Sequence, residues 1–222
     1  HDSTNGLGEA EQAAAAHGLQ LIAGVEISVT WQGHTLHVVG LHIDPLYQPL
    51  AQGLRAIRSG RGARAQLMAK SLAGCGIAGA LEGAARYATQ PELIGRTHFA
   101  RFLVEAGHAK DVRSVFKKYL VKGKPGYVSH QWANLADAVS WITGSGGVAV
   151  LAHPGRYLTG RKAMGKKNLR ELLREFVALG GRGIEVVSGS HTPEQYVEFA
   201  RYAREFDLYA SCGSDFHGPG ES

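Results

Sequence analysis

The apolar residues of this chain follow two different rhythms. Short apolar runs that predict strands lie at 19–29 and 34–43, and Trp31-Gln32-Gly33 between them predicts a hairpin-like turn. From Tyr47 to about Leu120 the apolar residues instead recur at helical spacing, with no convincing strand among them. The change of rhythm after Asp44-Pro45 therefore predicts an all-helical insertion.

A regular alternation of helices and strands follows Pro125. Helices are predicted at 134–143, 168–179 and 193–206, and strands at 147–152, 183–187 and 208–211. Such a βαβα order implies parallel strands with helices packed outside them. A further helix is predicted at 8–16, capped near Ser3 and Thr4 and stopped by Gly18. The pattern as a whole predicts an α/β protein.

Length and composition are those of a globular protein. With 222 residues, 44% of them hydrophobic, the chain can bury a sizeable core. We expect an α/β body made of 1–45 and 131–222, with the helical insertion at 46–130. No apolar run approaches the ~20 residues of a membrane span, and no signal peptide opens the chain. Cys75 and Cys212 form no CxxC pair, so a reducing cytoplasm fits best.

The net charge of +5 is unevenly distributed. Segment 46–130 carries 14 lysines and arginines against 4 acids, a formal charge of +10, which leaves −5 for the rest of the chain. A basic module on an acidic body points to a phosphorylated or polyanionic ligand. A solvated helical surface would give the same charge pattern, so this signal is not specific by itself.

Several imidazoles and carboxylates lie in or just after the predicted strands. Glu26 and His153 each follow an apolar run, His37 lies inside one, and Asp215 and His217 form an Asp-x-His pair near the end of the chain. The C-terminal ends of strands that alternate with helices meet at one rim of the fold. Imidazole together with carboxylate suits Zn, Mn or Fe. Any single one of these residues is more often structural, but their combination predicts a metal site.

Four motifs resemble those of the polymerase and histidinol phosphatase (PHP) superfamily. They are His1-Asp2-Ser3-Thr4, similar to the end of the family's Thr-Asp-His-Asp block; Gly24-Val25-Glu26-Ile27-Ser28 with His37 further on; Ala152-His153-Pro154-Gly155-Arg156; and Gly213-Ser214-Asp215-Phe216-His217. The insertion, with its segments 95–101 and 123–128, most resembles the small bacterial phosphoesterases that dephosphorylate nucleoside 3′,5′-bisphosphates. Close relatives of those enzymes degrade short RNA from the 5′ end.

The resemblance implies a distorted (β/α)7 barrel that holds two or three divalent metal ions, with manganese expected first and iron or zinc as alternatives. The ligands that it implies are His1, Glu26, His37, His153, Asp215 and His217. The family's first strand, with a His-x-His pair and a following Asp, has no counterpart here, so three of nine expected ligands are absent. We therefore expect the chain to be an N-terminally truncated part of a complete enzyme, and the truncated part itself to be inactive or impaired.

Substrate contacts are also implied by the resemblance. Arg96, His98, Arg101 and Lys124 are the expected contacts in the insertion, and its basic charge supports them. The alternative for each of them alone, equally weighted, is an exposed residue on a helix surface. Arg156 directly follows the His153 motif and would offer a forked donor pair to a phosphate. The alternative for Arg156 is a surface or capping arginine.

His191 follows the predicted strand at 183–187 and is the candidate catalytic residue. It is expected to donate a proton to the leaving alkoxide or to contact the substrate. The alternative, equally weighted, is a polar residue at the start of the helix that begins at Pro193.

Three functions fit these residues. The first is a metal-dependent phosphatase or phosphodiesterase that removes the 3′-phosphate of nucleoside 3′,5′-bisphosphates, degrades short RNA 5′→3′, or does both. The second is a PHP phosphatase for a small metabolite such as histidinol phosphate, which would not need an insertion of charge +10. The third is a non-catalytic RNA-binding remnant. A nucleotide or short RNA is the expected partner, with no membrane and no obligate protein partner.

Overall fold

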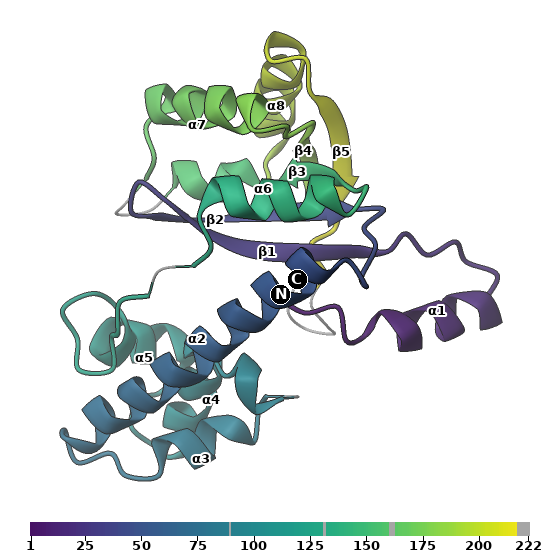
Figure 1. Ribbon diagram of the computed structural model, residues 1–222. Coiled ribbons are helices and arrows are strands. Elements are labelled where there is room, and N and C mark those ends of the chain that lie inside the picture. The colour runs from purple at the N-terminus through teal and green to yellow at the C-terminus, as the bar shows by residue number, and fades with distance from the viewer. Residues whose placement is uncertain (89, 131, 160–162, 217–222) are drawn as a thin grey trace. The chain divides into compact units, whose positions relative to one another are not determined.

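The computed structural model describes residues 1–88, 90–130, 132–159 and 163–216. The chain divides into two compact units (Figure 1). The first unit combines His1–Leu54 with Trp132–Ser222, and the second is Arg55–Gln131. Each unit has its own architecture, so the two are described in turn.

A five-stranded mixed sheet forms the first unit. Its strands are β1 (Gly24–Trp31), β2 (His34–Leu41), β3 (Val148–Leu151), β4 (Gly183–Ser188) and β5 (Tyr209–Gly213), in the order β1-β2-β3-β4-β5. The predicted α/β class is confirmed. Strands β3, β4 and β5 are parallel, as predicted, whereas β2 is antiparallel to both of its neighbours. Because a two-residue turn joins β1 to β2, this pair can only be antiparallel.

The predicted hairpin turn is confirmed, but the first strand begins later than the sequence suggests. Gln32 and Gly33 both have positive φ, 45° and 78°, as a tight hairpin of this hand requires. Strand β1 starts at Gly24 and not at Leu19, because Leu19, Leu21 and Ile22 are exposed and have no sheet to pack against. Glu26 therefore lies near the beginning of its strand and not at the end.

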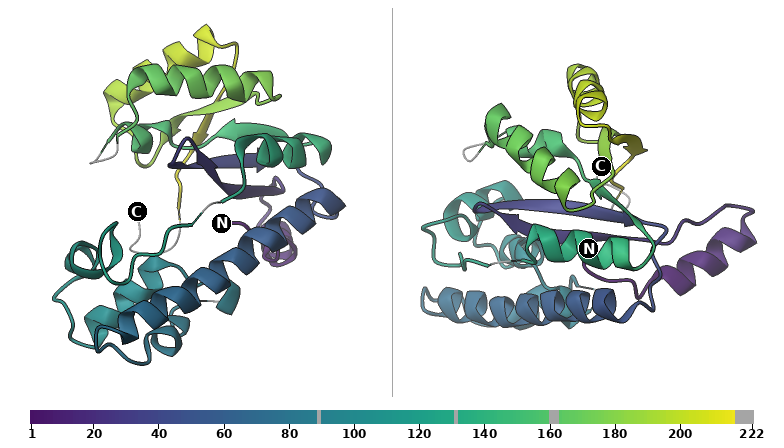
Figure 2. Two further views of the ribbon diagram at one scale, coloured as in Figure 1. Left: turned by 60° about the vertical axis from the view of Figure 1, so that its left-hand side comes forward. Right: turned by 45° about the horizontal axis from the view of Figure 1, so that its top comes forward.

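Helices cover one face of this sheet. They are α6 (Leu135–Gly144), α7 (Lys166–Ala178) and α8 (Pro193–Glu205), with the short helix η3 (Pro154–Leu158) after β3. Helix α6 lies across β1 and β2 in each view of Figure 2, and its Ile142 would be 2.9 Å from a Cβ on Gly40. From α7, Glu175 accepts a 2.7 Å hydrogen bond from Trp31 Nε1. Helix α8 packs mainly on β4.

Helix α1 (Leu7–Ala16) is not capped by Ser3 or Thr4 as predicted. Its N-cap is Gly6, which has no side chain to accept a hydrogen bond. Ser3 Oγ accepts from the Asn5 amide, because the chain turns before the helix begins. Gly18, with φ 66°, follows the helix as predicted.

The β1–β2 pairing separates an apolar face from a polar one. Val25, Ile27 and Val29 alternate along β1 and are buried. Glu26 and Ser28 point to the opposite face because side chains alternate along a strand. His37 pairs with Ser28 across the hairpin, so it shares this polar face with Glu26.

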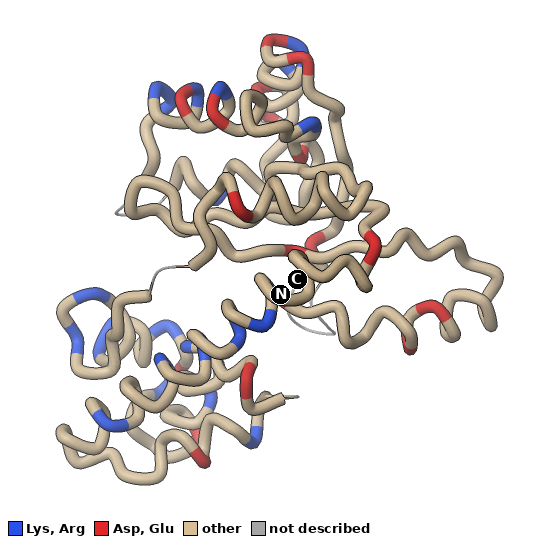
Figure 3. The backbone as a smooth tube through the Cα atoms, viewed as in Figure 1, with Lys and Arg blue, Asp and Glu red and all other residues tan. Residues whose placement is uncertain are grey.

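The second unit is helical, which confirms the helical spacing predicted for its sequence. Its helices are α2 (Gln48–Ala73, which begins in the first unit), α3 (Ala80–Ala85), α4 (Arg96–Glu105) and α5 (Val112–Val115), with short helices η1 (Pro91–Leu93) and η2 (Phe116–Leu120). Leu72, Phe99, Leu103 and Leu120 are fully buried in its core. Lysines and arginines are distributed along these helices (Figure 3). Across the described parts of the chain, no helix has both the length and the apolarity to cross a membrane.

Candidate metal centre

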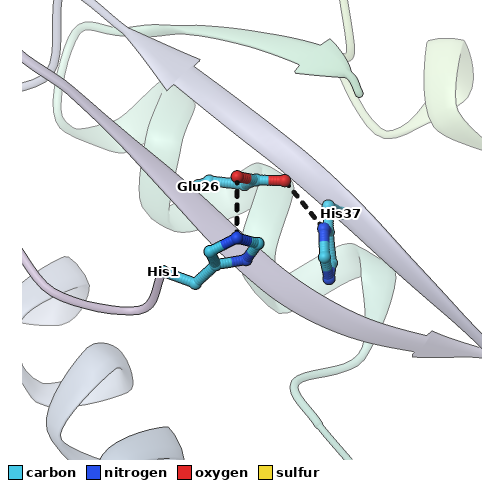
Figure 4. Close-up of side chains that lie close together, drawn as sticks. All are labelled: His1, Glu26 and His37. Carbon is cyan, nitrogen blue, oxygen red and sulfur yellow. Dashed lines mark ion pairs between the residues drawn. The ribbon is translucent and has the colours of Figure 1, made fainter. Parts of the chain in front are cut away.

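Glu26 is the centre of a group of histidines from three separate segments. Its Oε2 lies 3.3 Å from Nε2 of His1, and its Oε1 lies 2.7 Å from Nδ1 of His37 (Figure 4). The same Oε1 is 3.1 Å from Nε2 of His153. The sheet brings these residues together, since Glu26 comes from β1, His37 from β2 and His153 from the residue pair that follows β3.

Asp2 holds His1 beside the strand. The Asp2 carboxylate is fully buried and accepts hydrogen bonds from the Ser28 amide at 2.7 Å and the Ser28 hydroxyl at 2.9 Å. Its own amide donates to the Glu26 carbonyl at 2.9 Å. These bonds attach the start of the chain to the polar side of β1 and so direct the His1 ring at Glu26.

Glu26 belongs to two groups of side chains that could each hold a cation. One group is His1, Glu26 and His37, and the other is Glu26, His153 and Asp215. In each group the ligand atoms all lie within 4.8 Å of one another. A carboxylate shared in this way would suit a centre that holds more than one divalent ion.

The chemistry of these side chains fits divalent cations. Nδ1 of His37 and Nε2 of His153 face each other at 3.2 Å, so two nitrogens and one carboxylate oxygen converge on one point. His153 is 3% exposed, and its Nδ1 is buried without a hydrogen-bond partner among the described residues. Imidazole and carboxylate are suitable ligands for Mn, Fe and Zn.

The histidines also fix the charge of Glu26. Burial raises the pKa of the Glu26 carboxyl, but the hydrogen bonds and charges of His153 and His37 together outweigh it and hold that pKa well below its usual range. Glu26 therefore stays ionised at any ordinary pH, as a metal ligand must.

Arg156 and Asp215 are paired. A guanidinium nitrogen of Arg156 contacts a carboxylate oxygen of Asp215, whose side chain is 8% exposed while that of Arg156 is 46% exposed. The predicted metal ligand and the predicted phosphate contact thus lie side by side, with Arg156 on the solvent side. The predicted ligand His217 lies outside the described residues.

His191 is not arranged as a proton donor. Its Nε2 accepts the Gly155 amide at 3.1 Å and its Nδ1 lies 3.0 Å from the Val186 carbonyl. The residue is 7% exposed. Because an amide donates to Nε2, the proton must reside on Nδ1, where the carbonyl accepts it. Both nitrogens are therefore engaged by the backbone, which argues against the predicted acid role.

The second unit gathers several cations near the start of α4. Desolvation and the charges of Arg96 and Arg61 lower the pKa of Arg64 to about 10, despite an opposing effect of Tyr127. Desolvation, Arg101 and Arg61 together lower the pKa of His98. These mutual effects mean that the guanidinium groups lie close together. Three predicted contacts, Arg96, His98 and Arg101, belong to this group, while Lys124 is exposed in the turn after η2.

Sequence reasoning missed several residues that support these sites. Arg61 and Arg64 lie on α2 together with other charged residues that are exposed. The only signal in the sequence that could have distinguished them was their spacing along this helix. Asp2, Tyr157 and Glu185 each hold the backbone of a distant segment. The available signal was membership of the first motif for Asp2 and the position directly after the His153 motif for Tyr157.

Clustered histidines and carboxylates on the polar face of a mixed sheet are typical of metal-dependent hydrolases. No protein-family model matches the chain. The chain is 56% identical over 221 residues to a 3′,5′-nucleoside bisphosphate phosphatase from Chromobacterium violaceum, covering 100% of the chain and 76% of that protein. It is 44% identical over 221 residues to the 5′-3′ exoribonuclease Rnm of Escherichia coli, covering 99% of the chain and 73% of that protein.

Two solved structures are similar to the chain over its whole length. A structure described as an amidohydrolase from Chromobacterium violaceum, with bound sulfate and no metal, is 56% identical with a TM-score of 0.92 and covers 100% of the chain and 76% of its own. A Bifidobacterium adolescentis protein assigned as a metal-dependent phosphoesterase is 27% identical with a TM-score of 0.85. The match covers 100% of the chain and 76% of that protein. The chain therefore belongs to the family of 3′,5′-nucleoside bisphosphate phosphatases and 5′-3′ exoribonucleases, which are hydrolases. This relationship is the one expected from the sequence motifs.

Proposed function

We propose that the protein is a metal-dependent phosphoesterase that removes the 3′-phosphate of nucleoside 3′,5′-bisphosphates and degrades short RNA from its 5′ end. The observation that carries the proposal is the convergence of His1, His37 and His153 on Glu26 in a chain of this family. The relatives named for these two activities span the whole length of the chain. We further propose a cytoplasmic location, where nucleotides and RNA occur.

Two or three divalent ions would complete the site, with manganese first and iron or zinc as alternatives. The proposed ligands are His1, Glu26, His37, His153, Asp215 and His217. Bound divalent ions would supply a water of lowered pKa and neutralise charge on the phosphoryl oxygens. The chain's own part is to hold the ionised Glu26 between the two groups and to keep His153 away from solvent.

A (β/α)7 barrel is the architecture that we propose for the intact protein. The parallel order of β3, β4 and β5, with α7 and α8 between them along the chain, supports it. The proposed division places barrel parts at 1–45 and 131–222 and a basic insertion at 46–130.

The proposed substrate contacts are mainly arginines, with one histidine and one lysine. Arg156 would exchange its pairing with Asp215 for the phosphate once cations neutralise that carboxylate. In the second unit, Arg96, His98, Arg101 and Lys124 would contact the nucleotide, and we add Arg61 and Arg64 to them. Burial, together with the charges of Arg96 and Arg61, lowers the pKa of Arg64, so a dianionic ligand would offset the repulsion between these like charges.

A substrate comparison tests the proposed activity. With manganese added, the protein at its natural length should release phosphate from 3′-phosphoadenosine 5′-phosphate faster than from histidinol phosphate. The variant His153→Ala should lose turnover, whereas His17→Ala, at the exposed end of α1, should keep it.

Other outcomes would select the alternatives. Faster release from histidinol phosphate would contradict the proposal in favour of a metabolite phosphatase. Tight binding of short RNA without turnover of either substrate would favour an RNA-binding protein.

A further inference from the structure

The turn that carries His153 has an unusual backbone. His153 has φ 26°, a conformation that non-glycine residues rarely adopt. Two residues on, a Cβ at Gly155 would lie 2.7 Å from Cδ2 of His191, so no larger residue fits there without displacement. Such a conformation persists only when its surroundings hold it. Three side chains do so.

Tyr157 is the first of them. Its hydroxyl accepts the His37 amide at 2.9 Å and donates to the Ala152 carbonyl at 2.8 Å. The side chain is buried, and burial raises the pKa of the phenol, so the hydroxyl keeps its proton. One hydroxyl thus ties β2 at His37 to the residue immediately before His153.

Glu185 is the second. Its Oε2 accepts the His153 amide at 2.6 Å. The position follows from the parallel pairing of β3 with β4, in which Leu151 lies opposite Ile184. Glu185 is therefore one step further along β4, next to the point where the chain leaves β3.

His191 is the third. It accepts the Gly155 amide through Nε2 and is anchored through Nδ1 to the Val186 carbonyl. Its ring packs against Phe199 of α8, with centroids 4.7 Å apart. The ring therefore joins the His153 turn to the strand that also carries Glu185.

We propose that Tyr157, Glu185 and His191 are positioning residues that fix the direction of the His153 ring in the metal centre. The inference rests on the proposed function, because it assumes that His153 binds a cation. Each of the three bonds a backbone group between Ala152 and Gly155, and none of them needs to touch the metal. Groups that orient a metal ligand typically affect metal affinity or activity 10- to 100-fold.

The test compares two buried tyrosines in the first unit. Tyr157→Phe removes only the hydroxyl that bonds both ligand-bearing segments, and Tyr202→Phe makes the same change on α8, where the ring packs against Phe199 and Phe206. In the protein at its natural length, Tyr157→Phe should weaken Mn²⁺ binding by about 10- to 100-fold in calorimetric titration. Tyr202→Phe should bind as the wild type does.

A second pair of variants separates positioning from charge. Glu185→Gln keeps an acceptor for the His153 amide, whereas Glu185→Ala removes it. Mn²⁺ affinity should therefore be close to that of the wild type in the glutamine variant and should fall in the alanine variant. Without metal, hydrogen exchange at the His153 and Gly155 amides should be slow in the wild type. Exchange at the His153 amide should be faster in Glu185→Ala, and exchange at the Gly155 amide should be faster in His191→Ala.

The outcomes are distinguishable. Wild-type protein that binds none of Mn²⁺, Fe²⁺ and Zn²⁺ would overturn the proposed function and the inference together. Wild-type binding with unchanged affinity in Tyr157→Phe and Glu185→Ala would overturn the inference alone. Equal loss of affinity in Tyr157→Phe and Tyr202→Phe would reveal a general effect on folding and would also overturn it.

Discussion

At the scale of single residues, Glu26 and its neighbours define the chemistry. A carboxylate that contacts three imidazoles within 3.3 Å is held ionised and is aimed by its own partners. The resemblance to a known family predicted this residue and its partners from short motifs. Their geometry also depends on residues to which the sequence analysis assigned no role, because Asp2 and Tyr157 act on segments 26 and 120 positions away along the chain.

Asp2 gives a prediction for stability. Asp2→Ala removes two hydrogen-bond acceptors from the Ser28 amide and hydroxyl, both of which are buried. Leaving such groups unsatisfied should cost about 1–3 kcal/mol of the free energy of unfolding. Urea denaturation measures the loss, and Glu11→Ala on the exposed surface of α1 is the control. An Asp2→Ala protein as stable as the control would show that the buried carboxylate contributes nothing.

His98 gives a prediction for pH dependence. Desolvation, Arg101 and Arg61 lower its pKa below 6.5, and its Nδ1 accepts the Gly95 amide at 3.0 Å at the start of α4. Between the lowered folded-state pKa and 6.5, the unfolded chain binds more protons than the folded one. This contribution to stability is thus complete above pH 6.5 and is lost as the pH falls through the folded-state pKa.

The titration of His98 can be followed directly by NMR. Its midpoint should lie below the ordinary histidine value of 6.5. In His98→Gln, the stability of the second unit should depend less on pH between 5 and 7. A His98 midpoint at or above 6.5 would contradict the burial and the local charge distribution described for this residue.

At the scale of elements, the spacing of apolar residues predicted whether a segment is a helix or a strand better than it predicted where that segment begins and ends. Helices α6, α7 and α8 and strands β3 to β5 occur within two residues of the predicted positions, because their apolar residues are buried at regular intervals. The start of β1 was predicted too early, since an apolar residue looks the same in the sequence whether it is buried or exposed. This shift moves Glu26 along its strand, but the β1–β2 register still brings it beside His37.

Two glycines in the helical unit give opposite predictions. A Cβ at Gly83 of α3 would lie 2.2 Å from Cδ2 of Phe102 on α4, whereas a Cβ at Gly62 of α2 would meet no atom within 4 Å. Gly83→Ala should destabilise the protein by about 1–3 kcal/mol through overpacking. Gly62→Ala should stabilise it by about 0.5–1 kcal/mol, because alanine suits a helix interior better than glycine. Thermal melts of both variants measure these changes, and equal shifts of the same sign would contradict the packing of α3 on α4.

At the scale of the whole molecule, charge is separated between the two units. The second unit holds 14 lysines and arginines against 4 acids. If it holds phosphates, the affinity for a short 5′-phosphorylated RNA should fall with salt, by a logarithmic slope of about 0.7 for each phosphate contact. Arg64→Gln should reduce the slope, and Arg174→Gln on the exposed side of α7 should not. An affinity that does not change with salt would exclude an electrostatic role for this unit.

The sequence predicted this uneven distribution of charge but could not predict which basic side chains of the second unit lie close to one another. Arg61 and Arg64 approach Arg96 and His98 only because α2 and α4 pack in one helical unit. Nothing in the local sequence of either helix encodes that contact.

The most direct test of the metal centre is anomalous diffraction at the manganese edge, on crystals of the natural-length protein grown with Mn²⁺. The account predicts a peak within bonding distance of a carboxylate oxygen of Glu26 and of side chains from at least one of the two groups, His1 with His37 or His153 with Asp215. Manganese bound elsewhere, with Glu26 ordered and hydrogen-bonded only to the histidines, would contradict it.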